Sequence, residues 1–273
     1  MVIRKLMEVQ AMEVLNRIIA KAKQQSKDMT MAKSWESKYK CHLCKDTGFI
    51  LESREHLQPL AKECSCKVNR DIERAWCEFG VKPSQAKKIS EYKPYDKLTE
   101  NAKQKVINYI LNFDDKKENN WFLLMGQPGA GKSHLAIGIG VALFKEKHKK
   151  VIYMPYTEAI MGLKGNAKDF EKYMTLLEKY KNAEVLVIDD LFKDKVRNGN
   201  IIADMTEIDM KHIYPLLNYR YYNDLITIVS TECTPEMLEK LDGALAGRVM
   251  ERAENNIVIF CGDEYNYRLR NIR

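Results

Sequence analysis

The 273-residue sequence contains no run of 18 apolar residues, which is about the length that a membrane-spanning helix requires. Its opening stretch, MVIRKLMEVQAMEVL, is interrupted by charged side chains and lacks the continuous apolar region of a secretory signal peptide. From these absences we expect a cytoplasmic protein with no membrane partner. The apolar fraction of 45% and the charged fraction of 30% are those of a globular chain.

Seven cysteines, an odd number in a chain without a secretory signal, argue against a disulfide framework. Four of them form two short-spaced pairs, Cys41 with Cys44 and Cys64 with Cys66. Thiolates paired at this spacing, across a polar and hairpin-like stretch, suit tetrahedral Zn²⁺ because each pair can take one edge of the tetrahedron. His42 and His56 are competing ligands, and Cys77 is a spare thiol. A segment of about thirty residues is too short for its own core, so a structural zinc ion is predicted to organise it.

The excess positive charge lies in the first third of the chain. Residues 1–95 contain 19 Lys and Arg against 12 Asp and Glu, whereas residues 96–273 contain 26 of each. This excess suits an acidic partner or nucleic acid, and a solvated basic surface explains it equally well. Within residues 1–35, apolar side chains recur at helical spacing with Lys and Arg on the other face. Such a helix either folds onto its own domain or docks on a partner helix.

The patterns predict three segments. Residues 1–80 form a small helical and zinc-binding N-terminal domain, and residues 81–95, with chain-breaking prolines, form a linker. Residues 96–273 form an α/β domain in which strands and helices alternate, as in a parallel sheet covered on both faces. The five expected strands are 121–125, 151–154, 184–189, 225–230 and 256–260.

A phosphate-binding loop follows the first of these strands. It reads Gly-x-x-x-x-Gly-Lys-Ser between the apolar run WFLLM and the helical stretch LAIGIGVALF. The glycines let backbone N–H groups turn toward an anion, and the helix N-terminus adds its dipole. Lys132 is expected at the β- and γ-phosphates of ATP, and Ser133 at Mg²⁺. The predicted nucleotide-binding residues are Gly126, Gln127, Pro128, Gly129, Ala130, Gly131, Lys132, Ser133 and His134.

Carboxylates end the third strand, VLVIDD. The carboxyl end of a buried strand is where such sheets hold Mg²⁺, so Asp189 is predicted to hold the metal and Asp190 to orient or deprotonate the attacking water. One strand intervenes in sequence between the loop and this acidic strand, which indicates an ATPase with an extra central strand rather than a simple nucleotide kinase. The fourth strand brings Ser230, Thr231 and Glu232 to the same edge, where a polar group can sense the γ-phosphate.

Arginines follow in the C-terminal part of the chain. Arg248 and Arg252 stand four residues apart in LAGRVMERA, on one helical face. Such a cation is either a candidate arginine finger, which neutralises charge on the ATP of a neighbouring subunit, or an ordinary surface arginine. Arg268 and Arg270, in YNYRLR, are candidates to reach the nucleotide bound by their own chain.

Several motifs together resemble a known family. The ordered set GQPGAGKSHLA, VLVIDDL, IVSTECTPEML, GRVMER and YNYRLR, behind CHLCKDTGF and CSC, is similar to the bacterial and phage replicative helicase loaders of the DnaC/DnaI type, a branch of the AAA+ ATPases. The resemblance covers nearly the whole chain. It implies an ATPase that assembles with copies of itself in a spiral. It also implies an N-terminal region that binds a hexameric DnaB-type helicase and helps to place it on single-stranded DNA during DNA replication.

The resemblance implies roles for individual residues of the nucleotide site. Glu232 falls at sensor 1, Arg268 at sensor 2, and Arg252 is the first choice for the finger with Arg248 beside it. Two positions depart from the family. Asp190 is one methylene shorter than the commoner glutamate, so slow and partner-stimulated hydrolysis is expected. Glu232 replaces the usual amide and is expected to orient a neighbouring side chain.

Between the second and third strands the family places a helix that touches single-stranded DNA. Here that region reads TEAIMGLKGNAKDFEKY, in which Lys164 suits a phosphate contact and Phe170 or Tyr173 can stack on a base. The resemblance predicts a DNA contact at Lys164. The aromatic residue that the family has shortly after this lysine is displaced in this sequence.

Two other functions stay open. A transposase-helper ATPase of the IstB kind shares most AAA+ motifs, and it predicts binding to duplex DNA with no helicase partner. A zinc-dependent nucleic-acid adaptor with a structural ATP site predicts that Lys132→Ala leaves DNA binding and partner binding unchanged. The N-terminal cysteines and the amphipathic helix favour the loader.

Overall fold

The computed structural model describes residues 39–54, 57–113, 119–197, 199–262 and 267. Contacts divide the chain into two units, Met1–Asp71 and Ile72–Arg273. The helix expected within residues 1–35 lies outside the described residues, as do His56, Arg268 and Arg270. No helix in the described part of the chain is long and apolar enough to cross a bilayer.

The first unit contains an antiparallel hairpin next to the cysteines. Strand β1 (Phe49–Arg54) pairs with β2 (Leu57–Glu63), as the hairpin-like stretch between the cysteine pairs predicts. Before β1, Asp46 adopts a positive φ of 66°, and its carboxylate accepts a hydrogen bond of 2.9 Å from the backbone N–H of Cys41. An aspartate that bonds a nearby N–H group stabilises a tight turn. Helix α2 (Ser65–Phe79) begins directly after Cys64, the residue that follows β2, and contains Cys66.

The second unit is built on a five-stranded parallel sheet. Its strands are β3 (Phe122–Gly126), β4 (Val151–Pro155), β5 (Val185–Leu191), β8 (Ile226–Thr231) and β9 (Ile257–Phe260). They lie in the order β4-β5-β8-β3-β9, so β8 separates the strand that leads into the phosphate loop from the acidic strand. The five predicted strands and the predicted extra central strand are therefore confirmed.

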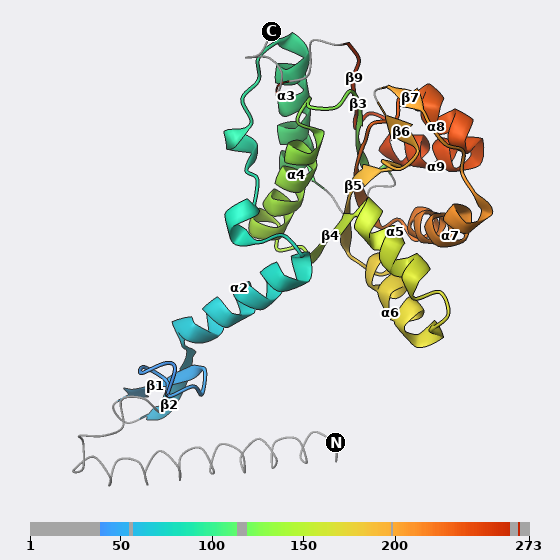
Figure 1. Ribbon diagram of the computed structural model, residues 1–273. Helices are drawn as coiled ribbons and strands as arrows, with labels where there is room; N and C mark the ends of the chain where they lie inside the picture. Colours follow the sequence, from blue (N-terminus) through green and yellow to red (C-terminus); the bar gives the residue numbers. More distant parts are fainter. Residues whose placement is uncertain (1–38, 55–56, 114–118, 198, 263–266, 268–273) are drawn as a thin grey trace, which may run out of the picture. The chain divides into compact units, whose positions relative to one another are not determined.

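Helices cover both faces of this sheet, so the second unit has three layers (Figure 1). One layer contains α3 (Lys97–Leu111) and α4 (Lys132–Glu146). The opposite layer contains α5 (Tyr156–Gly165), α6 (Phe170–Lys181), α7 (Glu207–Tyr222), α8 (Pro235–Leu241) and α9 (Gly243–Ala253). A short hairpin of β6 (Val196–Arg197) and β7 (Asn200–Ile201) follows β5.

The apolar runs of the strands explain the two cores. In β3, Phe122 and Leu124 belong to the core beneath α3 and α4, whereas Leu123 and Met125 belong to the core on the other face. Successive side chains of a strand point to opposite faces, so a strand covered on both faces must be apolar throughout. The two acidic side chains of β5, Asp189 and Asp190, accordingly stand near its carboxyl end.

Residues 81–95, expected as a linker, pack on α4 and belong to the second unit. The two 3₁₀ turns of this segment are η1 (Pro83–Gln85) and η2 (Ile89–Glu91). The side chain of Ile89 fills the space in which a Cβ on Gly138 would stand, 2.4 Å from its nearest atom. The stretch has the composition of a linker, but tertiary contacts that no local pattern reveals fix its position.

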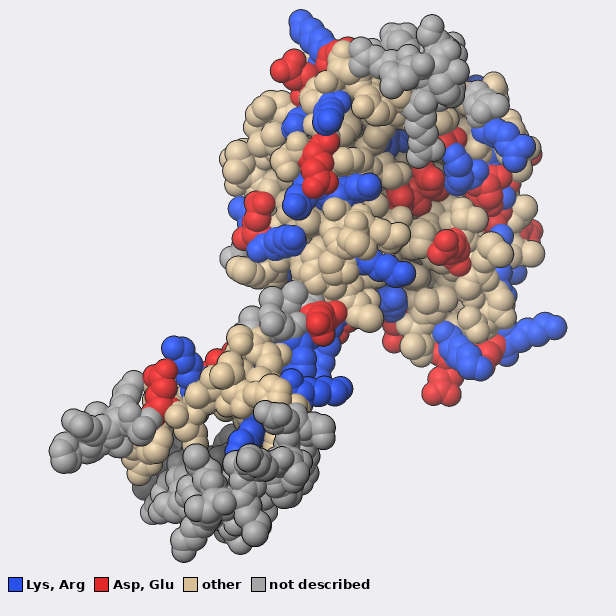
Figure 2. Space-filling view, turned by 60° about the vertical axis from the view of Figure 1, so that its left-hand side comes forward, with Lys and Arg blue, Asp and Glu red and all other residues tan. Residues whose placement is uncertain are grey.

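Charges of both signs are interspersed on the face of the second unit that Figure 2 shows. Residues 96–273 contain equal numbers of basic and acidic side chains, which agrees with this mixture. A mixed surface produces no strong field of one sign.

Candidate functional site

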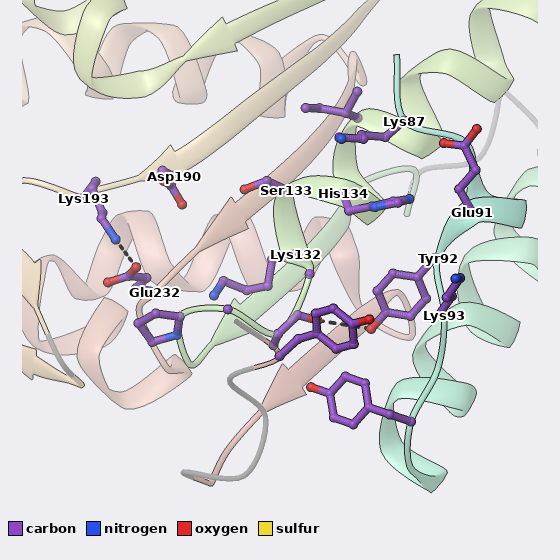
Figure 3. A pocket seen from close by; sticks show the side chains of 17 residues that line it. Lys87, Glu91, Tyr92, Lys93, Lys132, Ser133, His134, Asp190, Lys193 and Glu232 are labelled. Atoms are coloured by element: carbon purple, nitrogen blue, oxygen red, sulfur yellow. Dashed lines mark hydrogen bonds and ion pairs between the residues drawn. The ribbon is translucent and has the colours of Figure 1, made fainter. Parts of the chain in front are cut away.

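A cavity of about 570 Å³ opens at the carboxyl ends of β3, β5 and β8 (Figure 3). Its walls come from the phosphate loop, the start of α4, the acidic strand and residues 87–95. The charged residues that line it are Lys87, Glu91, Lys93, Lys132, Asp190, Lys193 and Glu232. The volume lies within the range of about 300–1,000 Å³ that small-molecule sites occupy.

Glycines shape the loop at the cavity floor. Gly126 and Gly131 have φ of 99° and 87°, a region that side chains rarely adopt. A Cβ on Gly126 would lie 2.2 Å from the carbonyl oxygen of Phe260, and a Cβ on Gly131 would lie 2.6 Å from the ring of Tyr92. Helix α4 begins directly after this loop, so its free N–H groups and positive dipole end open onto the cavity. The arrangement is that of a phosphate cradle.

Lys132 places a buried cation in this cradle. Lys132 is 5% exposed. Its Nζ donates hydrogen bonds to the carbonyl oxygens of Gly126 at 2.7 Å and of Gln127 at 2.6 Å. Burial lowers the pKa of Lys132 to about 8, although the nearby carboxylates of Glu232 and Asp190 act in the opposite direction. A phosphate at this position would supply the negative charge that favours the ammonium form.

The acidic strand presents its two carboxylates differently. The Asp189 carboxylate accepts hydrogen bonds from the Tyr153 hydroxyl at 2.9 Å and from the Ser230 hydroxyl at 2.5 Å. Asp190 lines the cavity and has a positive φ of 57°, and its N–H donates to Ser230 Oγ at 2.9 Å. Burial, followed by the charge of Asp189, raises the pKa of Asp190 above its ordinary value. Ser230 thus fixes both acidic residues, and Asp190 is the one aimed at the cavity.

Glu232 does not face phosphate as an unpaired charge. It is 6% exposed and forms an ion pair with Lys193, at the end of the cavity where Asp190 and Lys132 also lie (Figure 3). Lys193 is a site residue that sequence reasoning missed. Its only signal is its position three residues after Asp190 in DDLFK, where a turn brings it back toward the sheet edge.

A second group of missed residues closes the opposite end of the cavity. The Tyr92 hydroxyl donates to the carbonyl oxygen of Ala130 at 3.1 Å, and the ring of Tyr92 stands 5.6 Å from that of His134. Tyr267 donates its N–H to the carbonyl oxygen of Gly129 at 3.2 Å. Aromatic residues in EYKPY and YNY are the only sequence signal, because packing of distant segments brings them to the loop. Arg268 and Arg270 lie outside the described residues, although Tyr267 lines the cavity.

The candidate finger residues lie on α9 and do not line the cavity of their own chain. Arg252 Nη2 donates to the carbonyl oxygen of Tyr221 and forms an ion pair with Asp224, both at 2.5 Å. The guanidinium of Arg248 stands over the ring of Tyr214, 5.3 Å from its centre. An arginine finger acts on the nucleotide of a neighbouring subunit. The cavity of the chain that carries Arg248 and Arg252 therefore does not test this role.

Lys164, the predicted DNA contact, is engaged within its own chain. Its Nζ lies 2.7 Å from a carboxylate oxygen of Asp209, a residue that is 1% exposed and that also pairs with Lys195 at 2.6 Å. Of the two aromatic candidates, Phe170 is 77% exposed, whereas the Tyr173 hydroxyl hydrogen-bonds His212. The geometry gives Lys164 a structural role, and the DNA contact stays a prediction.

The four clustered cysteines of the first unit come together in space. Their sulfur atoms all lie within 4.8 Å of one another, and they are Cys41, Cys44, Cys64 and Cys66. The separation of 3.7 Å between Cys41 and Cys64 matches the edge of about 3.8 Å of a tetrahedron with Zn–S bonds of about 2.3 Å, whereas Cys44 and Cys66 lie closer together, at 3.2 Å. The N–H of Gly48 points at one sulfur at 3.3 Å, as outer-shell donors do at metal-bound thiolates. His42 is exposed and not part of the cluster, so four thiolates are the ligand set that fits Zn²⁺.

The strand order, the phosphate cradle and the acidic strand define an AAA+ P-loop ATPase. The family described as IstB-like ATP binding protein matches residues 20–269, and the chain belongs to this family. Its members are ATP-binding AAA+ ATPases. The predicted fold class and the predicted ATPase activity are therefore confirmed.

Three relatives show the range of similarity. The chain is 33% identical over 255 residues to the phage-like element PBSX protein XkdC of Bacillus subtilis (strain 168), covering 89% of this chain and 91% of that protein. It is 29% identical over 164 residues to the ATP-binding protein of insertion sequence IS21 from Pseudomonas aeruginosa, covering 60% and 57%. The crystal structure of the DnaC helicase loader has a similar fold, with a TM-score of 0.55, 21% identity and coverage of 69% of this chain and 99% of that one.

Proposed function

We propose that this chain is an ATP-dependent helicase loader that binds a DnaB-type hexameric helicase and assists its loading onto single-stranded DNA during DNA replication. The observation that carries the proposal is the presence, in one chain, of an AAA+ nucleotide cavity and a separate unit with a four-cysteine cluster. A nucleotide-controlled factor needs a docking module to act on a partner protein. The fold similarity to the DnaC helicase loader supports the assignment of the larger unit.

In this proposal the loop and the start of α4 hold the triphosphate of ATP. Ser133 and Asp189 would hold Mg²⁺, Asp189 through a water molecule because its carboxylate already accepts hydrogen bonds from Tyr153 and Ser230, and the ion would supply positive charge beside the phosphates. Asp190, whose carboxylate lines the cavity, orients or deprotonates the attacking water. Lys193 holds Glu232 at sensor 1, and Arg268 acts as sensor 2. The shorter carboxylate at Asp190 makes hydrolysis slow until a partner stimulates it.

Residues 1–80 act as the helicase-docking domain. Cys41, Cys44, Cys64 and Cys66 bind one structural Zn²⁺, which holds together a unit too small for its own core. The excess of Lys and Arg before residue 96 supports contact with an acidic partner or with single-stranded DNA. Lys164 contributes to DNA binding only if it leaves its ion pair with Asp209.

Self-assembly completes the nucleotide site. Arg252, with Arg248 beside it, reaches the ATP held by an adjoining copy and neutralises charge on its phosphates. In the ion pair between Arg252 and Asp224 the carboxylate is 58% exposed, whereas the Arg252 side chain is 14% exposed. A phosphate oxygen would replace Asp224 as the anionic partner of the guanidinium, and the exposed carboxylate would return to water.

A second candidate is a transposase-helper ATPase. The match to the IstB-like family and the similarity to the IS21 ATP-binding protein favour it specifically. That similarity covers 60% of this chain, whereas the one to XkdC covers 89%. A zinc-dependent nucleic-acid adaptor with a structural ATP site is the third candidate. It predicts that Lys132→Ala leaves DNA binding and partner binding unchanged, so this variant distinguishes it from the loader.

Pull-down experiments distinguish these functions. The full chain is presented with a hexameric DnaB-type helicase, and separately with duplex DNA, each with and without ATP. A loader retains the helicase, and its fragment 72–273, which keeps the whole second unit, does not. Retention of duplex DNA without helicase indicates the transposase helper and contradicts the loader.

A further inference from the structure

One tyrosine contacts both candidate finger arginines. Tyr221 lies near the end of α7, which packs against α9 in the same layer of the second unit (Figure 1). Its backbone carbonyl oxygen accepts a hydrogen bond from Arg252 Nη2. Its ring faces the guanidinium of Arg252 at 4.7 Å and that of Arg248 at 5.9 Å, measured to the ring centre.

The ring of Tyr221 is itself held in place. Its hydroxyl donates a hydrogen bond of 2.9 Å to Glu251, on the same helix as the two arginines. A second aromatic contact comes from Tyr222, whose ring centre lies 5.1 Å away. The hydrogen bond to Glu251 therefore ties the ring of Tyr221, on α7, to α9.

An aromatic ring orients a guanidinium in a way that a carboxylate cannot. The ring face attracts the cation through its quadrupole and leaves the positive charge available. Asp224, the carboxylate partner of Arg252, neutralises that charge and is 58% exposed. When a phosphate oxygen replaces Asp224, the ring and the carbonyl oxygen of Tyr221 stay in place and continue to direct the arginine.

We propose that Tyr221 is a positioning residue that aligns Arg252 and Arg248 toward the triphosphate held by an adjoining copy of the chain. This inference rests on the finger role proposed above. Tyr221 does not touch the nucleotide, and it acts only through the two arginines. It follows that a change at Tyr221 slows ATP hydrolysis in the cavity of the neighbouring copy and leaves the nucleotide cavity of its own chain intact.

Substitutions at Tyr221 separate alignment from packing. Tyr221→Ala keeps the backbone carbonyl and removes the ring, so we expect kcat for ATP hydrolysis to fall roughly tenfold with an unchanged KM for ATP. Tyr221→Phe keeps the ring face and should restore most of the rate, whereas Tyr221→Leu fills the space without a π-face and should not. Tyr219→Ala is the matched control, because that ring contacts Lys181 and neither arginine.

Mixing two defective full-length variants is the decisive experiment. The Lys132→Ala variant has an impaired nucleotide cavity and correctly aligned finger arginines. The Tyr221→Ala variant has an intact nucleotide cavity and misaligned finger arginines. In a one-to-one mixture, about a quarter of the interfaces of a head-to-tail assembly combine the intact cavity of a Tyr221→Ala chain with the aligned arginines of a Lys132→Ala chain. The mixture should therefore hydrolyse ATP faster than either variant alone.

A parallel mixture of Arg252→Ala with Lys132→Ala tests the finger itself. If that mixture recovers hydrolysis and the Tyr221→Ala mixture does not, the role of Tyr221 is wrong and the finger stands. If neither mixture recovers, the proposed finger is wrong, and the role of Tyr221 with it. A Tyr221→Ala or Tyr221→Leu chain that hydrolyses ATP at the wild-type rate also overturns the inference.

Discussion

Lys193 and Glu232 form an ion pair at the edge of the nucleotide cavity, next to Lys132 and Asp190. Glu232 is 6% exposed, so its charge needs this partner. The pair accounts for an acidic residue in a cavity that is built around a phosphate-binding loop. It also joins the turn after β5 to the end of β8, next to that loop.

Removal of the Glu232 charge should tighten nucleotide binding. In Glu232→Gln the cavity gains one net positive charge, and Lys193 becomes available to a phosphate oxygen. We expect the free energy of ATP binding to become more favourable by about 1 kcal/mol, which corresponds to a Kd for ATP that is about fivefold lower. Titration with a fluorescent ATP analogue measures this Kd.

Two further variants test whether charge is the cause. Lys193→Met should raise the Kd by a similar factor, and the double variant should return near the wild-type value because both charges are gone. Weaker binding in Glu232→Gln would show that the glutamate supports the nucleotide directly, contrary to this account.

The pKa of Lys132 predicts a pH dependence of ATP binding. Burial lowers this pKa to about 8 in the free protein, and bound phosphates should raise it, so binding takes up a proton near pH 8. Affinity should then fall as pH rises above about 8, because the neutral amine must first be protonated. Calorimetric titrations at pH 8 in two buffers of different ionisation enthalpy measure the uptake. Equal apparent enthalpies in the two buffers at pH 8 would contradict the prediction.

The sequence predicts the ATPase fold well because its signals are local. Five apolar strands, the glycine loop and the terminal Asp189 and Asp190 each lie within one short segment. Parallel strands bring their carboxyl ends to one edge, so these local motifs necessarily meet. The extra central strand, predicted from the strand that intervenes in sequence between the loop and the acidic strand, is confirmed.

The remaining parts of the site depend on distant contacts. Tyr92 reaches the loop only because the stretch that resembles a linker packs on α4, and Gly131 lacks a side chain where the ring stands. Lys193 and the partner of Lys164, Asp209, are likewise joined by tertiary structure. No periodicity or motif encodes such pairs. The sequence therefore predicts that Glu232 orients a neighbour without identifying Lys193, and it does not predict the ion pair of Lys164 with Asp209.

Arg220 should be essential for the stability of the second unit. It is fully buried and donates to the carbonyl oxygens of Tyr180, Lys181 and Ala183 at the end of α6, and to the start of β8. Arg220→Met leaves these acceptors without donors, and we expect the free energy of unfolding to fall by about 3 kcal/mol or more. Urea unfolding followed by circular dichroism measures the change.

A surface variant serves as the control for Arg220. Lys181→Met removes a cation that only stands over the ring of Tyr219, so the free energy of unfolding should change by less than about 0.5 kcal/mol. A loss of similar size in both variants would mean that the buried network around Arg220 is not the cause.

The cysteine cluster should bind one zinc ion per chain. Cys41→Ser removes one of the four thiolates and should abolish stoichiometric zinc, whereas Cys77→Ser, an exposed thiol outside the cluster, should retain it. Elemental analysis of the purified full-length proteins gives the ratio. Zinc retained at one ion per chain by Cys41→Ser would rule out the four-cysteine ligand set.

The central claim is that ATP controls an assembly of this chain with a ring-shaped helicase. The most direct test is size-exclusion chromatography with light scattering on the full chain mixed with a hexameric DnaB-type helicase. The account predicts a complex that contains both proteins, with more copies of this chain per hexamer in ATP than without nucleotide, and no such increase for Lys132→Ala. A chain that stays monomeric under every nucleotide and elutes apart from the helicase would contradict it.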